Sequence, residues 1–397
     1  MKNLLRVVYW AVLVLLILGG LYGAYERIIV GKEVANYGSL VPWGLWIALY
    51  TYLAGLAAGL YLLASLGVVF NWDVFKPVRK VAAAAAVVAL SAGLVHVWFD
   101  LGHMERFWEI FFRPSFTSIM GAMPWFYTAF IVVVVVQFYL EAQGGKERTI
   151  RWLGILGIVF AIIFSGGEGA LLGVLGSRPS WHAGLFPIRF LVAGLVTASA
   201  ALLVLVTFFW KNEAEQAELV RWLRGITLGL LAFSTLMEFA DISTALYGGS
   251  PAEKAALQAV LTGHLAWAFW GGQVLLGIAI PGAILLFAHK NRMLVGFAGL
   301  VLMVGFVAAR MNLLVPVLSV PELEGITEAY HSTRLSTSYF PSLIEWLISF
   351  GILSLALAAY TILWNWLHLA TPGKFEIPQR GPVAGGERLS VARSKEH

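Results

Sequence analysis

The sequence predicts an all-α integral membrane protein that crosses the bilayer about ten times. Of its 397 residues, 59% are hydrophobic and only 12% are charged, and long apolar stretches recur along nearly the whole chain. A transmembrane helix needs about 20 apolar residues, because the hydrocarbon layer is about 30 Å thick. A soluble globule of this length would need far more polar surface. The composition leaves no room for a large soluble domain.

Ten apolar runs, bounded by charged residues, glycine or proline, define the predicted helices. The first run follows a charged start as a signal peptide would, but it lacks a small-residue cleavage site and leads straight into another span, so we retain it. The predicted spans are 5–24, 42–70, 81–102, 124–141, 152–175, 185–210, 222–247, 262–289, 294–316 and 343–369. Residues 1–370 form the predicted membrane domain, and the polar residues 371–397 form a predicted cytoplasmic tail.

The distribution of lysine and arginine predicts the orientation. If the amino terminus is cytoplasmic, most of these residues fall in the inner connections and the tail, as the positive-inside rule requires. Both termini are therefore expected in the cytoplasm, and the protein in the cytoplasmic membrane. The longer segments 103–123, 248–261 and 317–342 would then face outward, where docking or chemistry is expected. This distribution also explains the net charge of +5, so no nucleic-acid partner is indicated.

The absence of cysteine limits the redox chemistry of the protein. Without cysteine it cannot hold an iron–sulfur cluster or a covalently attached haem. Apart from His289 and His368 at the inner ends of their spans, the histidines inside predicted spans are His96 and His264, both near the outer end. They could hold at most one haem, and we expect none. We also predict no metal site, so any redox metal belongs to a partner.

Eight ionisable residues inside the predicted spans fall in the outer half of the membrane, and the inner half is almost free of such groups. A charged group near the bilayer centre costs at least ~2.5 kcal/mol, so such residues are usually paired or functional. They are His96, Asp100, Glu168, Glu238, Asp241, His264, Arg310 and Glu345. This asymmetry points to chemistry near the outer face.

His96, Asp100 and Glu168 are the candidate catalytic residues. His96 and Asp100 are four residues apart and share one helix face, where a carboxylate can orient an imidazole and hold its proton. Glu168 lies among glycines, which either leave space for a head group or allow close helix packing. A quinol loses two protons with its two electrons, so these acceptors suit a quinone site. The alternative is that His96 only satisfies a backbone carbonyl.

Glu238 and Asp241 form a second candidate cluster. They are three residues apart on one helix face, and two unpaired carboxylates this close would repel each other. Arg310 is the expected compensating charge, with Glu345 as its competitor and His264 at the matching end of the next helix. Two interpretations stay open: an ion-pair network that holds the second half together, and a proton relay or second quinone-type site.

Three segments resemble one known family. They are VPWGLWIALYTYLAGLAAG at 41–59, FDLGHMERFWEIFFRPSFTS at 99–118 and LGVLGSRPSWHAGLFPIRFLVAGL at 172–195. Together they resemble the NrfD family, the membrane subunits of polysulfide reductase. The later helices, with ARMN at 309–312 and YFPSLIEW at 339–346, resemble its ten-helix branch, which includes the HybB and DsrP subunits.

The resemblance implies a fold and a set of partners. It implies two four-helix bundles plus two extra helices, with menaquinone or another quinone bound near the outer face and no haem or iron–sulfur cluster in this protein. A ferredoxin-like iron–sulfur subunit would dock outside, with further redox subunits, some of them cytoplasmic. Where the family more often has Gly-Arg, this sequence has Gly102-His103. By motif position, the implied cofactor-binding residues are His96, Asp100, Arg106, Glu168 and Arg178.

The sequence therefore predicts a quinone-reactive membrane subunit of a respiratory redox complex, without catalytic activity on its own. Electrons would pass between a quinone and the iron–sulfur subunit across the 103–123 and 176–184 loops. One alternative is an ion-translocating or transporter-type subunit, although the scarcity of inner-half charges disfavours it because transport needs access from both faces. Another alternative is a passive membrane anchor.

Overall fold

The computed structural model describes residues 2–288, 290–322, 325, 329 and 335–366. Every regular element in these ranges is a helix, and ten helices are long and apolar enough to cross a membrane, as the sequence predicts. They are α1 (Lys2–Ile29), α2 (Leu45–Val68), α3 (Arg79–Asp100), α5 (Ile119–Ala142), α6 (Glu147–Gly173), α7 (Phe186–Phe209), α8 (Glu213–Gly248), η4 continued by α10 (Ala268–Ala279 and Ile280–Phe287), α11 (Arg292–Ser319) and α13 (Leu343–Trp366).

The short elements lie in the connections between these spans. They are η1 (Lys32–Val34), η2 (Asp73–Phe75), η3 (Met104–Arg106), α4 (Glu109–Phe112) and α9 (Pro251–Thr262). The predicted outer loop 248–261 is thus mostly helical, because Ser250 and Glu253 form a capping box in which each side chain accepts a hydrogen bond from the other's amide. Similarly, α8 begins earlier than expected because Asn212 caps its first turn.

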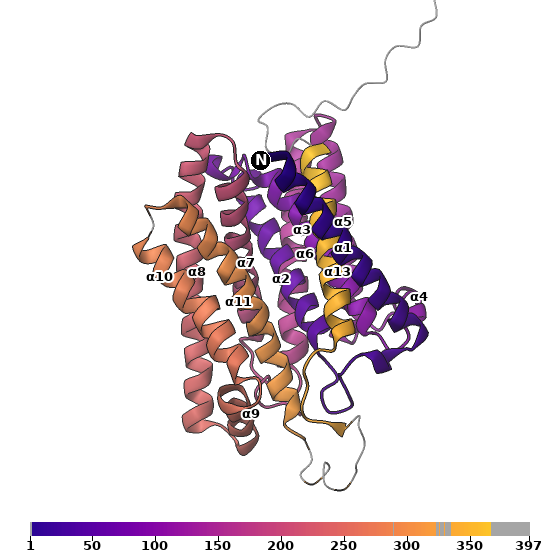
Figure 1. Cartoon of the computed structure of the whole chain (residues 1–397). Helices are drawn as coiled ribbons and strands as arrows, with labels where there is room; N and C mark the ends of the chain where they lie inside the picture. Colours follow the sequence, from indigo (N-terminus) through magenta and orange to yellow (C-terminus); the bar gives the residue numbers. More distant parts are fainter. Residues whose placement is uncertain (1, 289, 323–324, 326–328, 330–334, 367–397) are drawn as a thin grey trace, which may run out of the picture.

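The spanning helices form two bundles that lie side by side (Figure 1). The first bundle contains α2, α3, α5 and α6, and the second contains α7, α8, η4 with α10, and α11. The remaining two helices, α1 and α13, pack against each other, and α13 also contacts α3. This confirms the expected pair of four-helix bundles with two extra helices.

The orientation of the first and last spans agrees with an even number of crossings. In Figure 1, α1 begins and α13 ends at the same end of the molecule, while α4 and α9 lie at the opposite end. Their assignment to the cytoplasmic side stays a prediction. The predicted tail, residues 371–397, lies outside the described residues.

Many large apolar side chains are exposed on the outer helix faces. Leu15, Leu236 and Phe239, for example, are exposed on α1 and α8. A water-soluble monomer rarely exposes contiguous apolar surface on this scale, whereas lipid solvates it. The protein is therefore a multi-pass membrane protein.

Glycines bring the two bundles into direct contact where α2 crosses α7. A Cβ atom on Gly59 would collide with the carbonyl oxygen of Gly194, and one on Gly194 would collide with the carbonyl oxygen of Gly55. Small residues at such a crossing let two transmembrane backbones approach closely.

We expect the Gly194→Val variant to lose about 1–3 kcal/mol of stability, because the added methyl groups overpack this crossing. The matched control is Gly229→Val on α8, where nothing lies within 4 Å of an added Cβ. Thermal unfolding in detergent measures both. Equal unfolding temperatures for the two variants would show that the crossing is not tightly packed.

Candidate functional site

A series of hydroxyl groups leads to Glu168 inside the first bundle. Tyr127 of α5 donates a hydrogen bond to Oε1 of Glu168 on α6 at 3.0 Å, and the hydroxyls of Tyr127 and Tyr50 on α2 are themselves hydrogen-bonded. Glu168 is only 3% exposed, and its Oε2 has no hydrogen-bond partner in the described part of the protein. Buried polar atoms are rarely left in this state unless a ligand or water completes them.

His96 of α3 is also buried with one free polar atom. Its Nδ1 lies 2.8 Å from the carbonyl oxygen of Ala92, and its Nε2 has no partner among the described residues. One turn earlier, α3 packs on α2, since a Cβ on Gly93 would lie 3.2 Å from the carbonyl oxygen of Tyr50. The backbone bond considered as the simpler explanation of His96 is present, and the second ring nitrogen is buried without a partner among the described residues.

Asp100 does not orient His96, which corrects the prediction from their spacing. No hydrogen bond joins the two side chains. Nδ1 of His96 contacts the carbonyl oxygen of Ala92, and Oδ1 of Asp100 is buried without a partner in the described structure. The charges that act on Asp100 are those of Glu345 and Arg27. Asp100 therefore belongs to the end of α3 rather than to a histidine–carboxylate pair.

Arg27 and Tyr37 hold this end of α3 in place. Arg27 donates hydrogen bonds to the carbonyl oxygens of Phe99 at 3.1 Å and Leu101 at 2.8 Å, which satisfies acceptors that a helix end leaves free. Tyr37 donates to the carbonyl oxygen of Asp100 at 3.5 Å. Burial, followed by the charge of Asp100, raises the pKa of Tyr37 to about 12, so the hydroxyl stays protonated.

Arg106 and Arg178, both expected in the quinone pocket by motif position, do not join this cluster. The Arg106 side chain is 63% exposed and lies 3.8 Å from the carboxylate of the preceding residue. Arg178 donates to the carbonyl oxygens of Val317 and Val320 and pairs with Glu322 at 3.0 Å. It binds the carboxyl end of α11, because the loop that carries it lies over that end.

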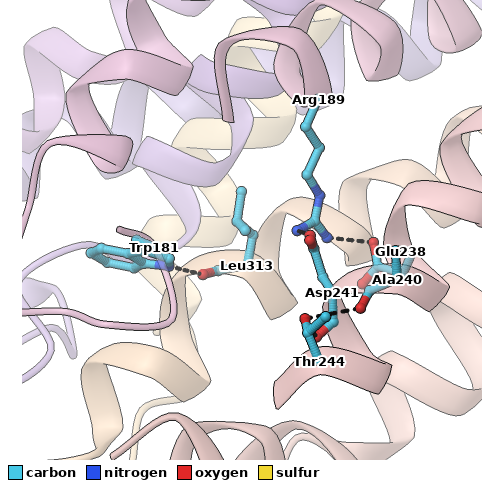
Figure 2. A network of polar contacts seen from close by, with 7 residues as sticks. All are labelled: Trp181, Arg189, Glu238, Ala240, Asp241, Thr244 and Leu313. Atoms are coloured by element: carbon cyan, nitrogen blue, oxygen red, sulfur yellow. Dashed lines mark hydrogen bonds and ion pairs between the residues drawn. The ribbon is translucent and has the colours of Figure 1, made fainter. Parts of the chain in front are cut away.

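A second polar cluster joins α7 to α8 (Figure 2). Arg189 donates to Oε2 of Glu238 at 2.5 Å and also to Oδ2 of Asp241. Arg310 was the expected compensating charge, but the partner of both carboxylates is Arg189. The reason is the short connection between antiparallel α7 and α8, which places the first turn of α7 beside the last turns of α8.

Arg310 of α11 stands apart from these carboxylates. It is 6% exposed, and its guanidinium carbon lies 4.0 Å from the centre of the Phe190 ring. Within the described ranges it has no hydrogen bond and no ion pair. Its guanidinium approaches α2, since Nη2 would lie 3.5 Å from a Cβ on Gly55, and its charge interacts with that of Glu168.

Glu345 forms the amino-terminal cap of α13 instead of joining the Glu238 cluster. Its carboxylate accepts hydrogen bonds from the Ser342 amide at 2.9 Å, the Asn36 amide at 3.0 Å and the Tyr339 hydroxyl at 2.5 Å. The Ser342 hydroxyl accepts from the Glu345 amide in return, which completes a capping box. His264 also belongs to this region, with Nε2 3.2 Å from the carbonyl oxygen of Tyr339. These contacts give Glu345 and His264 a structural role, and the proton-relay role considered for them stays a prediction.

We expect Tyr339→Phe to lower the free energy of unfolding by about 1–3 kcal/mol. The Tyr339 hydroxyl accepts a hydrogen bond from the buried Leu45 amide at 2.8 Å, and its loss would leave that amide unsatisfied. Burial, followed by the charge of Glu345, raises the pKa of Tyr339, which keeps it a donor to that carboxylate. The control is Tyr9→Phe, whose exposed hydroxyl bonds to Thr361. Thermal unfolding should separate the two variants; matching curves would contradict this account.

A cavity of about 460 Å³ opens in the second bundle, between α7, α8, α9, η4 and α11. Its polar lining includes Arg189, Glu238, Asp241, Gln273, Arg310 and Asn312. Trp181 also lines it and donates a hydrogen bond to the carbonyl oxygen of Leu313 at 2.8 Å (Figure 2). On one wall the π-helical turns of η4 carry Gln273, which accepts a hydrogen bond from Asn312 at 3.1 Å. None of the lining residues comes from α3, so this cavity is separate from His96.

Sequence reasoning missed Tyr50, Tyr127 and Arg189. The two tyrosines lie inside apolar runs and carry no charge, so a search for intramembrane charges passes over them. Arg189 follows Pro187 at a helix start and was counted with the outer helix ends. A signal was present, because an arginine inside the first turn of a spanning helix needs a partner in the membrane.

Comparison with known proteins establishes the family. The family described as "Polysulphide reductase, NrfD" matches residues 33–322, which is most of the sequence. The protein belongs to the NrfD family. The matched region begins before α2 and ends after α11, so it contains both four-helix bundles.

Several relatives extend the similarity beyond this region. A selenate reductase subunit from Mesobacillus selenatarsenatis is 30% identical over 90% of this protein and 93% of its own length. The Hdr-like menaquinol oxidoreductase integral membrane subunit of Archaeoglobus fulgidus is 28% identical over 89% of this protein and 92% of its own length. A polysulfide reductase component from Wolinella succinogenes is 28% identical over 63% of this protein and 84% of its own length. The first two relatives match nearly the full ten-helix length of this NrfD protein.

Proposed function

We propose that this NrfD protein is the quinone-reactive membrane subunit of a respiratory redox complex in the cytoplasmic membrane. The quinone site lies in the first bundle, at Glu168 and His96. The observation that carries the proposal is a pair of buried titratable side chains, Glu168 and His96, each with one polar atom that has no partner among the described residues.

Glu168 and His96 are residue types that suit the two oxygens of a quinone head group. Such a group has two oxygens that accept hydrogen bonds when oxidised and donate them when reduced, so each oxygen needs a titratable partner. Oε2 of Glu168 and Nε2 of His96 can take either role, depending on their protonation. The Tyr127 ring and the Phe164 ring, with centres 5.3 Å apart, supply aromatic surface beside the carboxylate.

In this proposal a bound quinone supplies the two-electron, two-proton chemistry. Glu168 holds one proton at Oε2, while Tyr127 fixes Oε1 through its hydroxyl. His96 holds the second proton at Nε2, and the backbone contact of Nδ1 with Ala92 orients the ring. The Tyr50 hydroxyl steadies Tyr127 from α2.

The names of the relatives support a menaquinol-type substrate and a multisubunit complex. The Archaeoglobus relative is named as part of a menaquinol oxidoreductase, and it matches nearly the whole sequence. Because this protein contains no cysteine, electrons must continue to a partner. That partner is a ferredoxin-like iron–sulfur subunit on the outer face, with further redox subunits in the complex.

The proposed docking surface is the segment 103–118, which includes η3 and α4. It exposes Phe107, Trp108, Phe112 and Phe116 beside charged residues. Aromatic residues with charged neighbours are typical of protein interfaces. The surface lies directly after α3, so a docked cluster would come close to the His96 helix.

A titration tests the proposal on purified protein in lipid nanodiscs. Menadione, a soluble naphthoquinone, is added while tryptophan fluorescence is followed. We expect saturable binding to the wild type, weakened about tenfold or more at the first-bundle site in the His96→Ala, Glu168→Gln double variant. Thr227→Val, which changes a buried threonine bonded within α8, is the control and should bind as the wild type does. If the double variant binds menadione as tightly as the wild type does, the proposed quinone site is wrong.

The two alternatives make different predictions. A passive anchor would bind no menadione above the level of empty nanodiscs. A transporter-type subunit would need access from both faces of the membrane. The carboxylates that suggested it are engaged in the structure, since Glu238 and Asp241 are paired with Arg189 and Glu345 caps α13. The quinone-reactive function is therefore the one that the arrangement of polar groups supports best.

A further inference from the structure

The cavity in the second bundle contains a guanidinium whose N–H donors have no hydrogen-bond acceptor in the described structure. Arg310 lines this cavity and is 6% exposed. The Phe190 ring covers one face of its guanidinium at 4.0 Å, but the N–H donors of a guanidinium lie in its plane and need oxygen acceptors. No hydrogen bond or ion pair to Arg310 occurs within the described ranges. A buried cation without acceptors is costly, so an oxygen atom in the cavity, from a ligand or from water, would stabilise Arg310.

The other charges in the cavity indicate that this ligand is neutral. Arg189 is already paired with both Glu238 and Asp241, so this group of three carries one excess negative charge (Figure 2). An anionic ligand on Arg310 would meet this excess inside the same cavity and be repelled. A carbonyl oxygen accepts hydrogen bonds from Arg310 without adding a charge.

The volume and the aromatic lining of the cavity suit a ligand that has an apolar ring with polar groups. Its volume of about 460 Å³ falls within the range of small-molecule pockets. Trp181, Phe186 and Phe269 contribute aromatic walls. Asn312 lines the cavity as well, and its Oδ1 has no hydrogen-bond partner in the described structure, so it can accept from a ligand hydroxyl.

We propose that this cavity is a second quinone site, in which one ring oxygen binds Arg310 and the other end of the ring lies toward Asn312. The inference rests on the proposed function only in assuming that the protein handles quinones. Its residues come from α7, α8, α9, η4 and α11, whereas those of the first site come from α2, α3, α5 and α6. The protein would then hold two quinone head groups at separate positions.

The number of bound quinones tests this inference. Purified protein in nanodiscs of zwitterionic lipid is saturated with menadione, and the bound amount is measured by equilibrium dialysis against empty nanodiscs. We expect two equivalents per protein molecule for the wild type. The cavity-filling variants Ser234→Phe on α8 and Ala309→Phe on α11 should each retain one equivalent, since both residues line the cavity. The His96→Ala, Glu168→Gln double variant should also retain one, and its combination with Ala309→Phe none.

The outcomes separate the two proposals. One equivalent in the wild type, lost in the His96 and Glu168 double variant and unaffected by either phenylalanine, would overturn the second site and leave the first. One equivalent lost only with the phenylalanine variants would overturn the first site and leave the second. A cavity that takes an anionic lipid head group would lose its menadione in nanodiscs of anionic lipid, which would also overturn the inference. Thermal unfolding of each variant identifies any that has lost its fold. Because Ser234 and Ala309 lie on different helices, the two phenylalanine variants fill the cavity independently of each other.

Discussion

Replacing Glu168 by glutamine is expected to slow quinol-dependent turnover of the assembled complex by a factor of about 100 to 10,000, the usual contribution of a positioned proton acceptor. The substitution keeps the size of the side chain and a hydrogen-bond acceptor for Tyr127, so the packing of the first bundle should survive. It removes the capacity of Oε2 to hold a proton. Turnover is measured in membranes that contain the complete complex, with menadiol as the electron donor.

Two further variants make this result specific. Tyr127→Phe removes the hydroxyl that fixes Oε1 of Glu168 but keeps the carboxylate, so its loss of turnover should be smaller. Thr227→Val on α8 removes a buried hydroxyl far along the sequence from the site and should leave turnover unchanged. If Glu168→Gln turns over within about twofold of the wild type, proton transfer does not depend on this carboxylate.

Replacing Arg189 by methionine is expected to destabilise the protein by about 3 kcal/mol, since it leaves two carboxylates in the membrane without their counter-charge. The side chains of Arg189 and Glu238 are mostly buried, while that of Asp241 is 45% exposed. Most of the loss should therefore come from the Glu238 pair. Thermal unfolding in detergent measures the effect.

The same experiment has a rescue and a control. Adding Glu238→Gln and Asp241→Asn to Arg189→Met removes the unpaired charges and should restore most of the stability. Arg221→Met, which removes an exposed partner of Glu218 at 3.9 Å, should change little because exposed ion pairs contribute about 0–1 kcal/mol. A triple variant no more stable than Arg189→Met alone would show that the charges are not what Arg189 satisfies.

Much of the fold could be predicted because membrane helices are recognisable by the length of their apolar runs. The ten spans, their grouping and the family were all predicted and then confirmed. The boundaries depend on local caps, which a search for apolar runs does not use. Ser250 with Glu253, and Ser342 with Glu345, are both spaced as capping boxes in the sequence, so these helix starts could have been found.

The site was predicted only in part, because spacing along one helix says which residues share a face but not what lies opposite. His96 and Glu168 were expected inside the membrane and are buried, while their quinone-binding role stays a prediction. The expected contact between His96 and Asp100 is not present, because Nδ1 of His96 contacts Ala92 instead. The partner of Glu238 depends on how α7 meets α8, which only the packed structure supplies. Arg310 illustrates the same limit, since its position between α11, Phe190 and Gly55 follows from the contact between bundles.

The most direct measurement is an electron cryo-microscopy map of the complex saturated with menaquinone. We predict density for a ring in the first bundle, with one oxygen within hydrogen-bond distance of the Glu168 carboxylate and the other near Nε2 of His96. A map in which side chains fill that position under saturating quinone, with ring density absent there, would contradict the central claim.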